Sequence, residues 1–385
     1  MGGVSMEWKE VTLGEIAIFK TGKLNSNAAI SNGEYPFFTC SPETLRINSY
    51  AFDQEAILLA GNNAEGYFSI KYYKGKFNAY QRTYVITPIR GKVDIKFLYY
   101  ALSLCLKQLK NMSQGTSTKF LTVTILNSFS VKLPSISDQR RIASILSSLD
   151  RKIELNNKIN ADLEEMAQTI FKNWFVDFEP FKDGKFVDSE LGMIPEGWKV
   201  GTLGDITKNK SAKVKERNDV KVLSPVTTGE LVLSEEYFTK QVFSSSIAKY
   251  KIVNKGDFAY NPARVNIGSL GRNEFDFDGC VSPVYVVFSV LDGYENYFDL
   301  FRKTDFFKDS VASLAIGGVR QSLSYDDLSS IEVIIPSENA VEEFNNLYNQ
   351  MKKTIKANKL ENSRLSTLRD TLLPRLMSGE QEVPE

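Results

Sequence analysis

The most extended hydrophobic pattern of this chain runs through residues 149–178, with an approach that begins at Asp138. Glu, Asp, Lys and Arg occupy many of the positions between the apolar ones. The pattern predicts a long amphipathic helix with a coiled-coil seam, and Asn156 places a polar residue at one seam position. The apolar seam positions at seven-residue steps around it are Ile142, Leu149, Leu163 and Ile170.

A second segment near the C-terminus repeats this pattern at a constant offset of 202 residues. In this repeat Asn358 corresponds to Asn156, and Asn362 corresponds to Asn160. We expect these four asparagines to hydrogen-bond across a helix seam and to fix its register. The alternative is that they face solvent, because a seam of period 3.5 drifts around a helix of period 3.6. The matching apolar positions are Phe344, Met351, Leu365 and Leu372.

The repeat extends beyond the two helical segments. The Trp-Lys and Thr-Leu-Gly sequences at residues 8–14 return at residues 198–204, and the Pro-Ser pair at residues 134–135 returns at residues 336–337. A period this long excludes a solenoid and indicates a duplicated unit of globular domain plus helix. The division that follows is a first globular domain at 6–136, a central long helix at 137–179, a second globular domain at 180–337 and a distal long helix at 338–380.

Each globular half combines short β-rich runs with one or two helices and a glycine-containing loop. We therefore predict an α/β (α+β) fold, in which two duplicated globular domains are separated by two long antiparallel coiled-coil helices with pseudo-two-fold symmetry. The predicted strands lie at residues 56–60, 84–86 and 285–287, the predicted helices at 95–111 and 297–314, and the loops at 115–119 and 317–321.

Composition narrows the class of protein without naming a function. The 385 residues carry 47 basic and 47 acidic side chains, but residues 1–135 hold 15 Lys and Arg against 9 Asp and Glu. A basic first half permits a polyanion partner, while a neutral whole does not require one. No apolar run reaches the length of a membrane span and no signal-peptide core is present, so we expect a cytoplasmic protein.

The inventory of catalytic groups is poor. The chain has no histidine, which removes histidine-based acid–base catalysis and metal ligation, and its three cysteines fit no metal-ligand spacing. Residues 261–264 (Asn-Pro-Ala-Arg) resemble the Asn-Pro-Pro-aromatic motif of amino-methyltransferases, but they lack the second proline and the aromatic residue. Asp94 and Lys96 form a carboxylate-x-Lys triplet that is common by chance. We predict no catalytic residue and no metal site in this chain.

Several motifs together resemble one family, over about residues 6–380. They are PSISDQRRI at 134–142, IFKNWFVDFEPF at 170–181 and LRDTLLPRLMSGE at 368–380, with the duplicated Trp-Lys and Thr-Leu-Gly openings. The chain resembles the specificity subunit of type I restriction-modification systems. The resemblance implies that each globular half is a target recognition domain for one half of a bipartite, asymmetric sequence in double-stranded DNA.

The same resemblance implies which partners and cofactors belong to the complex. The paired helices would act as a spacer and would dock two modification (methyltransferase) subunits, and restriction or translocase subunits would join them. S-adenosylmethionine, and ATP with Mg²⁺, are expected on those partner subunits, and no cofactor is expected in this chain. For partner docking we single out Ile170, Phe171, Trp174 and Phe175; the alternative is that they pack beside the globular halves.

Residue types suggest where DNA is contacted. Lysines interleaved with aromatic residues suit phosphate contact, while Gln and Arg hydrogen-bond to base edges. The alternative for the lysines is a strand with a solvated face. The candidates are Lys71, Lys74, Lys76, Gln81, Arg82 and Lys119 in the first half and Arg264, Arg272, Arg320 and Gln321 in the second half.

Two other functions stay open at this point. One is a coiled-coil adaptor that does not recognise DNA, and the other is a self-contained DNA methyltransferase. The absence of a glycine-rich cofactor loop disfavours the methyltransferase.

Overall fold

The computed structural model describes residues 8–238, 240, 242–244, 246–314 and 322–381. The chain divides into two compact units. Unit 1 combines the chain up to Asn157 with the segment from Asn358 onward, and unit 2 is Lys158–Ala357. Both boundaries fall inside the two longest helices, α4 (Ile136–Phe175) and α10 (Glu338–Ser378).

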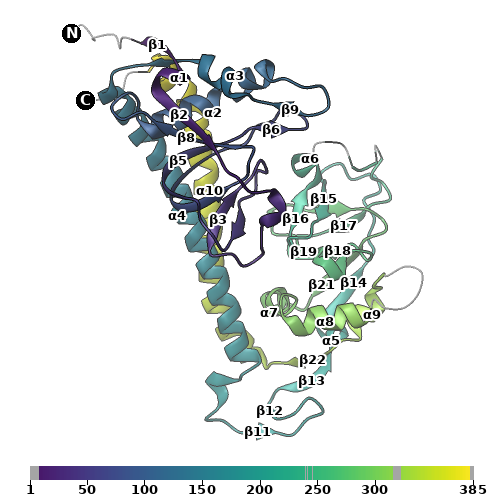
Figure 1. Cartoon of the computed structure of the whole chain (residues 1–385). Coiled ribbons are helices and arrows are strands. Elements are labelled where there is room, and N and C mark those ends of the chain that lie inside the picture. Colours follow the sequence, from purple (N-terminus) through teal and green to yellow (C-terminus); the bar gives the residue numbers. More distant parts are fainter. Residues whose placement is uncertain (1–7, 239, 241, 245, 315–321, 382–385) are drawn as a thin grey trace, which may run out of the picture. The chain divides into compact units, whose positions relative to one another are not determined.

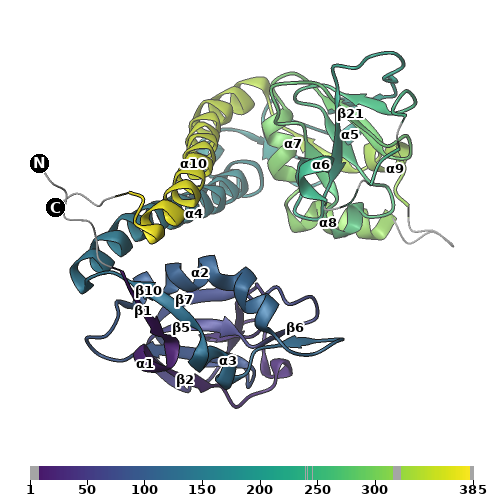
Figure 2. The same cartoon turned by 90° about the horizontal axis from the view of Figure 1, so that it is seen from above.

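The long helices begin in the same way and pair antiparallel within each unit. Ser135 accepts a hydrogen bond from the Asp138 amide at 3.2 Å, and Ser337 accepts one from the Ala340 amide at 3.4 Å. These serines cap orphan amides at a helix start, as Pro-Ser before a helix predicts. In unit 1, Asp150 of α4 bonds to Arg369 of α10. Figures 1 and 2 show α4 and α10 alongside one another.

A two-stranded ribbon with two short helices recurs in both units. In unit 1 the ribbon pairs β1 (Lys9–Thr12) with β10 (Ser130–Leu133), and in unit 2 it pairs β13 (Lys199–Thr202) with β22 (Glu332–Ile335). A threonine capping box follows the first strand each time and buries the next leucine completely. The short helices are α1 (Leu13–Ile16) and α3 (Val123–Ser128) in unit 1, and α5 (Leu203–Ile206) and α9 (Tyr325–Ser329) in unit 2.

Unit 1 is built on a six-stranded sheet in the order β2-β8-β5-β7-β3-β4. Figure 2 shows helix α2 (Ile95–Met112) on one face of this sheet. Phe97 and Leu98 of this helix are buried in the core of unit 1. Asp94 caps α2 by accepting hydrogen bonds from the amides of Lys96 and Phe97, which accounts for the carboxylate-x-Lys triplet. The strands are β2 (Ala17–Thr21), β3 (Tyr35–Phe38), β4 (Leu45–Ile47), β5 (Phe52–Ala60), β7 (Ile70–Ala79) and β8 (Thr83–Pro88), beside a small pair of β6 (Asn62–Asn63) with β9 (Lys119–Phe120).

Unit 2 repeats the strand order of this sheet, with two shorter strands in place of β5 and two in place of β7. Its sheet β14-β21-β18-β19 is fully antiparallel, as β2-β8-β5-β7 is in unit 1. A second sheet has the order β16-β15-β20-β17, in which β15 pairs parallel with β20 as β3 does with β7. The strands are β14 (Thr207–Lys210), β15 (Lys221–Pro225), β16 (Leu231–Leu233), β17 (Lys251–Val253), β18 (Phe258–Tyr260), β19 (Leu270–Arg272), β20 (Gly279–Val281) and β21 (Val286–Val290). The remaining elements are α6 (Ser234–Tyr237), the hairpin of β11 (Phe186–Val187) with β12 (Ile194–Pro195), and the 3₁₀ turns at Ser26–Ala28, Glu179–Phe181 and Val265–Ile267.

One predicted element is wrong in part. The helix expected at residues 297–314 is two helices, α7 (Glu295–Phe301) and α8 (Asp305–Leu314). Thr304 interrupts the predicted helix. Its hydroxyl accepts a hydrogen bond from the backbone amide of Phe307 at 3.3 Å and so caps the start of α8. Among the described residues, no helix combines the length and apolar character needed to cross a membrane.

Candidate nucleic-acid interface

Strand β7 carries three of the predicted DNA contacts, and two of them are exposed. Lys74 and Lys76 lie opposite Glu55 and Asp53 of β5 in the strand register. Lys76 also holds its ammonium 4.7 Å from the ring centre of Tyr50. Cross-strand carboxylates reduce the positive potential of this face. Lys74 and Lys76 stay predicted phosphate contacts, and the carboxylates opposite them offset part of their positive charge.

Lys71 requires a correction. Its side chain leaves the opposite face of β7, since neighbouring strand residues alternate. The ammonium donates to the carbonyls of Ser41 and Glu43 at 3.0 Å each, and burial lowers its pKa. Lys71 therefore fastens residues 41–43 to the sheet, and we no longer place it on DNA.

The turn between β7 and β8 presents Gln81 and Arg82, and both side chains are exposed. The side chain of Gln81 donates from Nε2 to Oδ1 of Asn25 at 2.7 Å. Its backbone amide donates to the carbonyl of Leu24 at 2.9 Å. These bonds hold the turn against residues 24–25. Both residues stay predicted DNA contacts, with Gln81 already oriented by a neighbour.

Lys119 belongs to a cluster that sequence analysis did not find. Strand β9 places Lys119 opposite Asn63 of β6, and Figure 1 shows the two strands side by side. The ammonium of Lys110 lies 3.5 Å from the ring centre of Tyr67, whose side chain is 68% exposed. Gly66 has a φ of +75°, and a Cβ there would lie within 3.3 Å of the stems of both lysines. We call Tyr67, Lys110 and Lys119 the loop-tip cluster.

The loop-tip cluster combines two cations with an exposed aromatic ring, which suits a nucleic-acid backbone and a base or sugar. Its members are distant along the chain, so no local motif marks them. The β6–β9 pairing brings Lys119 to the loop that carries Tyr67.

In unit 2, Arg272 also requires a correction. Its guanidinium donates to Oδ1 of Asn296 at 3.0 Å and lies 5.8 Å from the ring centre of Phe258. Asn296 in turn donates to the side chains of Asn345 and Asn349 on α10, each at 2.9 Å. Arg272 is thus part of a polar network that joins β19, α7 and α10, and we no longer place it on DNA. Arg320 and Gln321 lie outside the described residues.

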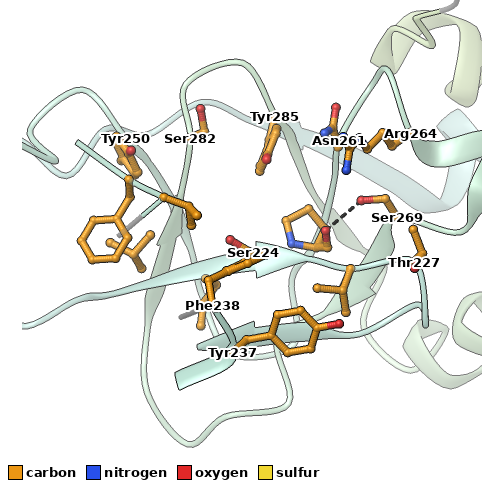
Figure 3. A pocket seen from close by; sticks show the side chains of 16 residues that line it. Ser224, Thr227, Tyr237, Phe238, Tyr250, Asn261, Arg264, Ser269, Ser282 and Tyr285 are labelled. Carbon is orange, nitrogen blue, oxygen red and sulfur yellow. Dashed lines mark hydrogen bonds between the residues drawn. The ribbon is translucent and has the colours of Figure 1, made fainter. Parts of the chain in front are cut away.

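Arg264 lines a surface hollow of unit 2 (Figure 3). Polar groups come from the strand β15, from the turn after β18 and from the segment before β21. Figure 3 shows Asn261 and Arg264 next to each other, with Ser269 and Tyr285 close by. Arg264 is the only charged side chain among the described residues that line it. They are Val222, Leu223, Ser224, Pro225, Val226, Thr227, Tyr237, Phe238, Val242, Phe243, Tyr250, Asn261, Arg264, Ser269, Ser282 and Tyr285.

The helix seam contains the predicted asparagines. Asn156 is fully buried and donates from Nδ2 to Oδ1 of Asn362 at 2.9 Å and to Glu361 at 2.7 Å. Asn362 donates to Oδ1 of Asn157 at 2.8 Å. The hydrogen bonds that Asn156 and Lys152 donate to Glu361 lower the pKa of that carboxyl. Asn160 is buried and Asn358 is half-buried. Their role in fixing the register stays a prediction.

The four residues predicted to dock partner subunits divide into two pairs according to their burial. Phe171 and Phe175 are 1% and 5% exposed, and Phe175 packs 5.0 Å from Phe344 and 5.1 Å from Tyr297 between ring centres. Partner docking through these two rings is therefore wrong, because they fill the core of unit 2. Ile170 and Trp174 are half-buried against the same core and keep part of their surface free.

The described residues include no group of three or more Cys, Asp or Glu side chains that could hold a metal ion. Cys280 is buried, and burial raises the pKa of its thiol to about 11. A thiol held protonated in this way is a poor nucleophile.

Comparison with known proteins points to one family. The family model described as the type I restriction modification DNA specificity domain matches residues 6–165. The specificity subunit of the EcoDI type I restriction enzyme from Escherichia coli is 31% identical over 379 residues, covering 87% of this chain and 79% of the relative. The MjaIX specificity subunit from Methanocaldococcus jannaschii is 29% identical over 348 residues, with the same two coverages.

A solved structure shares the fold. The crystal structure of the S subunit of a type I restriction-modification system from M. genitalium matches with a TM-score of 0.64 at 17% identity. The match covers 100% of this chain and 98% of that chain. The predicted fold class, with two long helices and two duplicated α/β parts, is confirmed.

Proposed function

The chain belongs to the specificity subunits of type I restriction-modification systems, and on this premise we propose that its two globular parts recognise the two halves of a bipartite, asymmetric DNA sequence. One observation carries the proposal. The ribbon and the order of strand pairing are the same in both units, whereas the side chains that equivalent strands carry differ. A shared frame with different surfaces suits two half-targets of different sequence.

The long helices would then set the distance between the half-targets. Helix α4 has 40 residues and α10 has 41, so each rises ~60 Å at ~1.5 Å per residue. Duplex DNA repeats every ~34–36 Å, which leaves room for two segments about one turn or more apart. Duplicating one heptad in each helix adds ~10 Å and lengthens the gap by about three base pairs.

Methyl transfer and ATP-driven steps would belong to partner chains. This chain has no histidine, and burial raises the pKa of the Cys280 thiol, which supports a non-catalytic role. We propose that modification subunits bring S-adenosylmethionine, and that restriction subunits bring ATP with Mg²⁺. Those subunits also supply backbone contacts that a neutral chain does not provide alone.

We place the docking of modification subunits on apolar side chains that the helices leave exposed. In unit 1, Leu155, Leu360 and Leu368 are 51%, 54% and 47% exposed. Leu360→Asp is expected to abolish co-purification with the modification subunit while the chain keeps its stability. Ser363→Asp, at an exposed position of the same helix, is the matched control.

The test of recognition is methylome sequencing of cells that express this chain with its modification subunit. We expect methylated adenines in a two-part asymmetric motif with a fixed gap. Replacing residues 8–135 with the same region of a relative should change one half of that motif only. An assembled complex without sequence-specific methylation contradicts the proposal and favours the adaptor.

A further inference from the structure

We infer that the hollow of unit 2 recognises a guanine of the second half-target through Arg264 and Asn261. The inference rests on the proposed function and names the residues and the base that one half of it uses. The loop-tip cluster of unit 1 provides charge and stacking, whereas this hollow provides directed hydrogen-bond donors.

Backbone hydrogen bonds fix the turn that carries both side chains. The Arg264 amide donates to the Asn261 carbonyl at 2.9 Å, and the Arg264 carbonyl accepts from the amides of Ile267 and Ser269 at 3.2 and 3.1 Å. The Leu323 amide donates to the carbonyl of Pro262 at 3.1 Å. A turn fixed in this way loses little backbone conformational entropy on binding.

The side chain of Asn261 is oriented as a donor. Its Oδ1 accepts a hydrogen bond from the backbone amide of Ala263 at 3.1 Å, which fixes the orientation of the side-chain amide. The Nδ2 group then remains for a ligand, since an asparagine amide has two donors on its nitrogen.

The guanidinium of Arg264 is free to bind a ligand, unlike those of the other described arginines of unit 2. Four arginines of unit 2 lie in its described part, and three of them have side-chain partners. Arg217 bonds to two aspartates, Arg272 to Asn296, and Arg302 to Asp299. No hydrogen bond or ion pair of the described residues engages the Arg264 guanidinium, and its side chain is exposed.

The hollow thus offers donors and one positive charge, with no carboxylate in its described lining. In the major groove, guanine presents two acceptors, N7 and O6, and Arg contacts both with its fork. Adenine presents a donor beside its acceptor, and so fits a set of donors less well. The hydroxyls of Ser282 and Tyr285 line the same hollow and add hydrogen-bonding capacity.

The position of the hollow also suits a specificity determinant. Ser224 and Pro225 belong to β15 (Lys-Val-Leu-Ser-Pro), whose counterpart in the strand order of unit 1 is β3, with the different sequence Tyr-Pro-Phe-Phe. Residues that lie where the two units differ are the ones that can make the two half-targets differ.

The experiment compares the methylation motifs of wild type, Arg264→Ala, Arg264→Lys and Asn261→Ala, each expressed with the modification subunit. Lys199→Ala, an exposed residue of the β13–β22 ribbon, is the control. We expect Arg264→Ala to lose at least about tenfold in preference for a guanine at one position of the second half. Arg264→Lys should lose it as well, because an ammonium keeps the charge but lacks the planar fork. Asn261→Ala should weaken the same position, and the first half-motif should stay intact in every variant.

Three results separate the possibilities. A second half without any G·C pair, or an unchanged motif in Arg264→Ala, overturns the inference and leaves the proposed function standing. A motif that Arg264→Lys preserves overturns it too, and makes Arg264 a phosphate contact. A wild-type complex that methylates no bipartite motif removes the proposed function itself. The intact first half-motif shows in the same data that each variant folds and assembles.

Discussion

Asn156 of α4 donates a hydrogen bond of 2.9 Å to the side chain of Asn362 on α10, at a position where a coiled-coil seam is otherwise apolar. Asn156 is fully buried and its own Oδ1 has no partner among the described residues. A buried polar residue of this kind lowers stability and disfavours other registers of the two helices. Under the proposed function, the register bears on the gap between half-targets.

We predict that Asn156→Leu raises the free energy of unfolding by about 1 kcal/mol, because it replaces an incompletely paired amide with an apolar seam residue. The same variant should methylate sites with more than one gap length, because the register loses its polar restraint. Urea unfolding and methylome sequencing measure the two effects. Asn173→Leu, on the exposed face of α4, is the control. A single unchanged gap in Asn156→Leu would show that the register does not depend on this hydrogen bond.

We predict that Lys119→Gln weakens DNA binding to all sequences alike. A phosphate contact carries no sequence information, so the slope of log affinity against log salt should fall by about 1 while the methylation motif stays the same. Fluorescence anisotropy of the assembled complex at several salt concentrations measures the slope. Lys132→Gln, an exposed change on β10, should leave it unaltered. A changed motif would instead assign Lys119 to base recognition.

We predict that Phe171→Ala lowers the free energy of unfolding of the isolated chain by about 3–5 kcal/mol, because the ring is fully buried beside Phe175 and Phe344. Denaturant unfolding without any partner subunit measures the loss. Loss of assembly at unchanged stability would contradict this result and restore partner docking to Phe171.

We predict that Asp299→Asn lowers stability by about 3 kcal/mol at neutral pH, because it leaves the buried Arg302 without its carboxylate partner at 2.6 Å. Burial alone would raise the pKa of Asp299, but the charges of Arg302, Lys303 and Lys352 outweigh burial, and the pKa falls to about 2.

The pH dependence of this variant follows from the lowered pKa. The contribution of the ion pair is complete above the ordinary carboxyl pKa of about 4 and is lost as the pH falls through about 2. The difference in stability between wild type and Asp299→Asn should therefore shrink from pH 5 to pH 2. Urea unfolding at each pH measures it. Asp305→Asn, which removes an exposed ion pair with Lys308, should change stability by less than about 0.5 kcal/mol at any pH. A difference that stays constant down to pH 2 would exclude the ion pair as its source.

The helical part of the fold could be predicted because its cause is periodic and local. Seven-residue spacing, a Pro-Ser start and a polar residue at one seam position are all visible in residues 134–178 and again 202 residues later. The break at Thr304 was not foreseen. Apolar residues continue through it, and the cap that starts α8 depends on one hydroxyl.

Burial and bonding partners decided which of the predicted DNA contacts remain candidates. A linear sequence pattern contains neither kind of information. Lys71 and Lys74 are three residues apart on one strand, but alternation sends them to opposite faces, and Lys71 meets two carbonyls from residues 41–43. Arg264 and Arg272 are equally basic, yet an amide from α7 engages only Arg272. The sequence pattern did not indicate Tyr67 and Lys110, because the end of α2 and the loop that carries Tyr67 meet only in the folded chain.

The sequence by itself determined the duplication, the two long helices and the family, because repeats and hydrophobic periods are properties of neighbouring residues along the chain. The tertiary structure decided which charged side chains remain free, which aromatic rings fill the core and which donors line the hollow. Those outcomes depend on contacts between distant segments, and the free energy of a charged or aromatic group is set by the partners and the burial that such contacts provide.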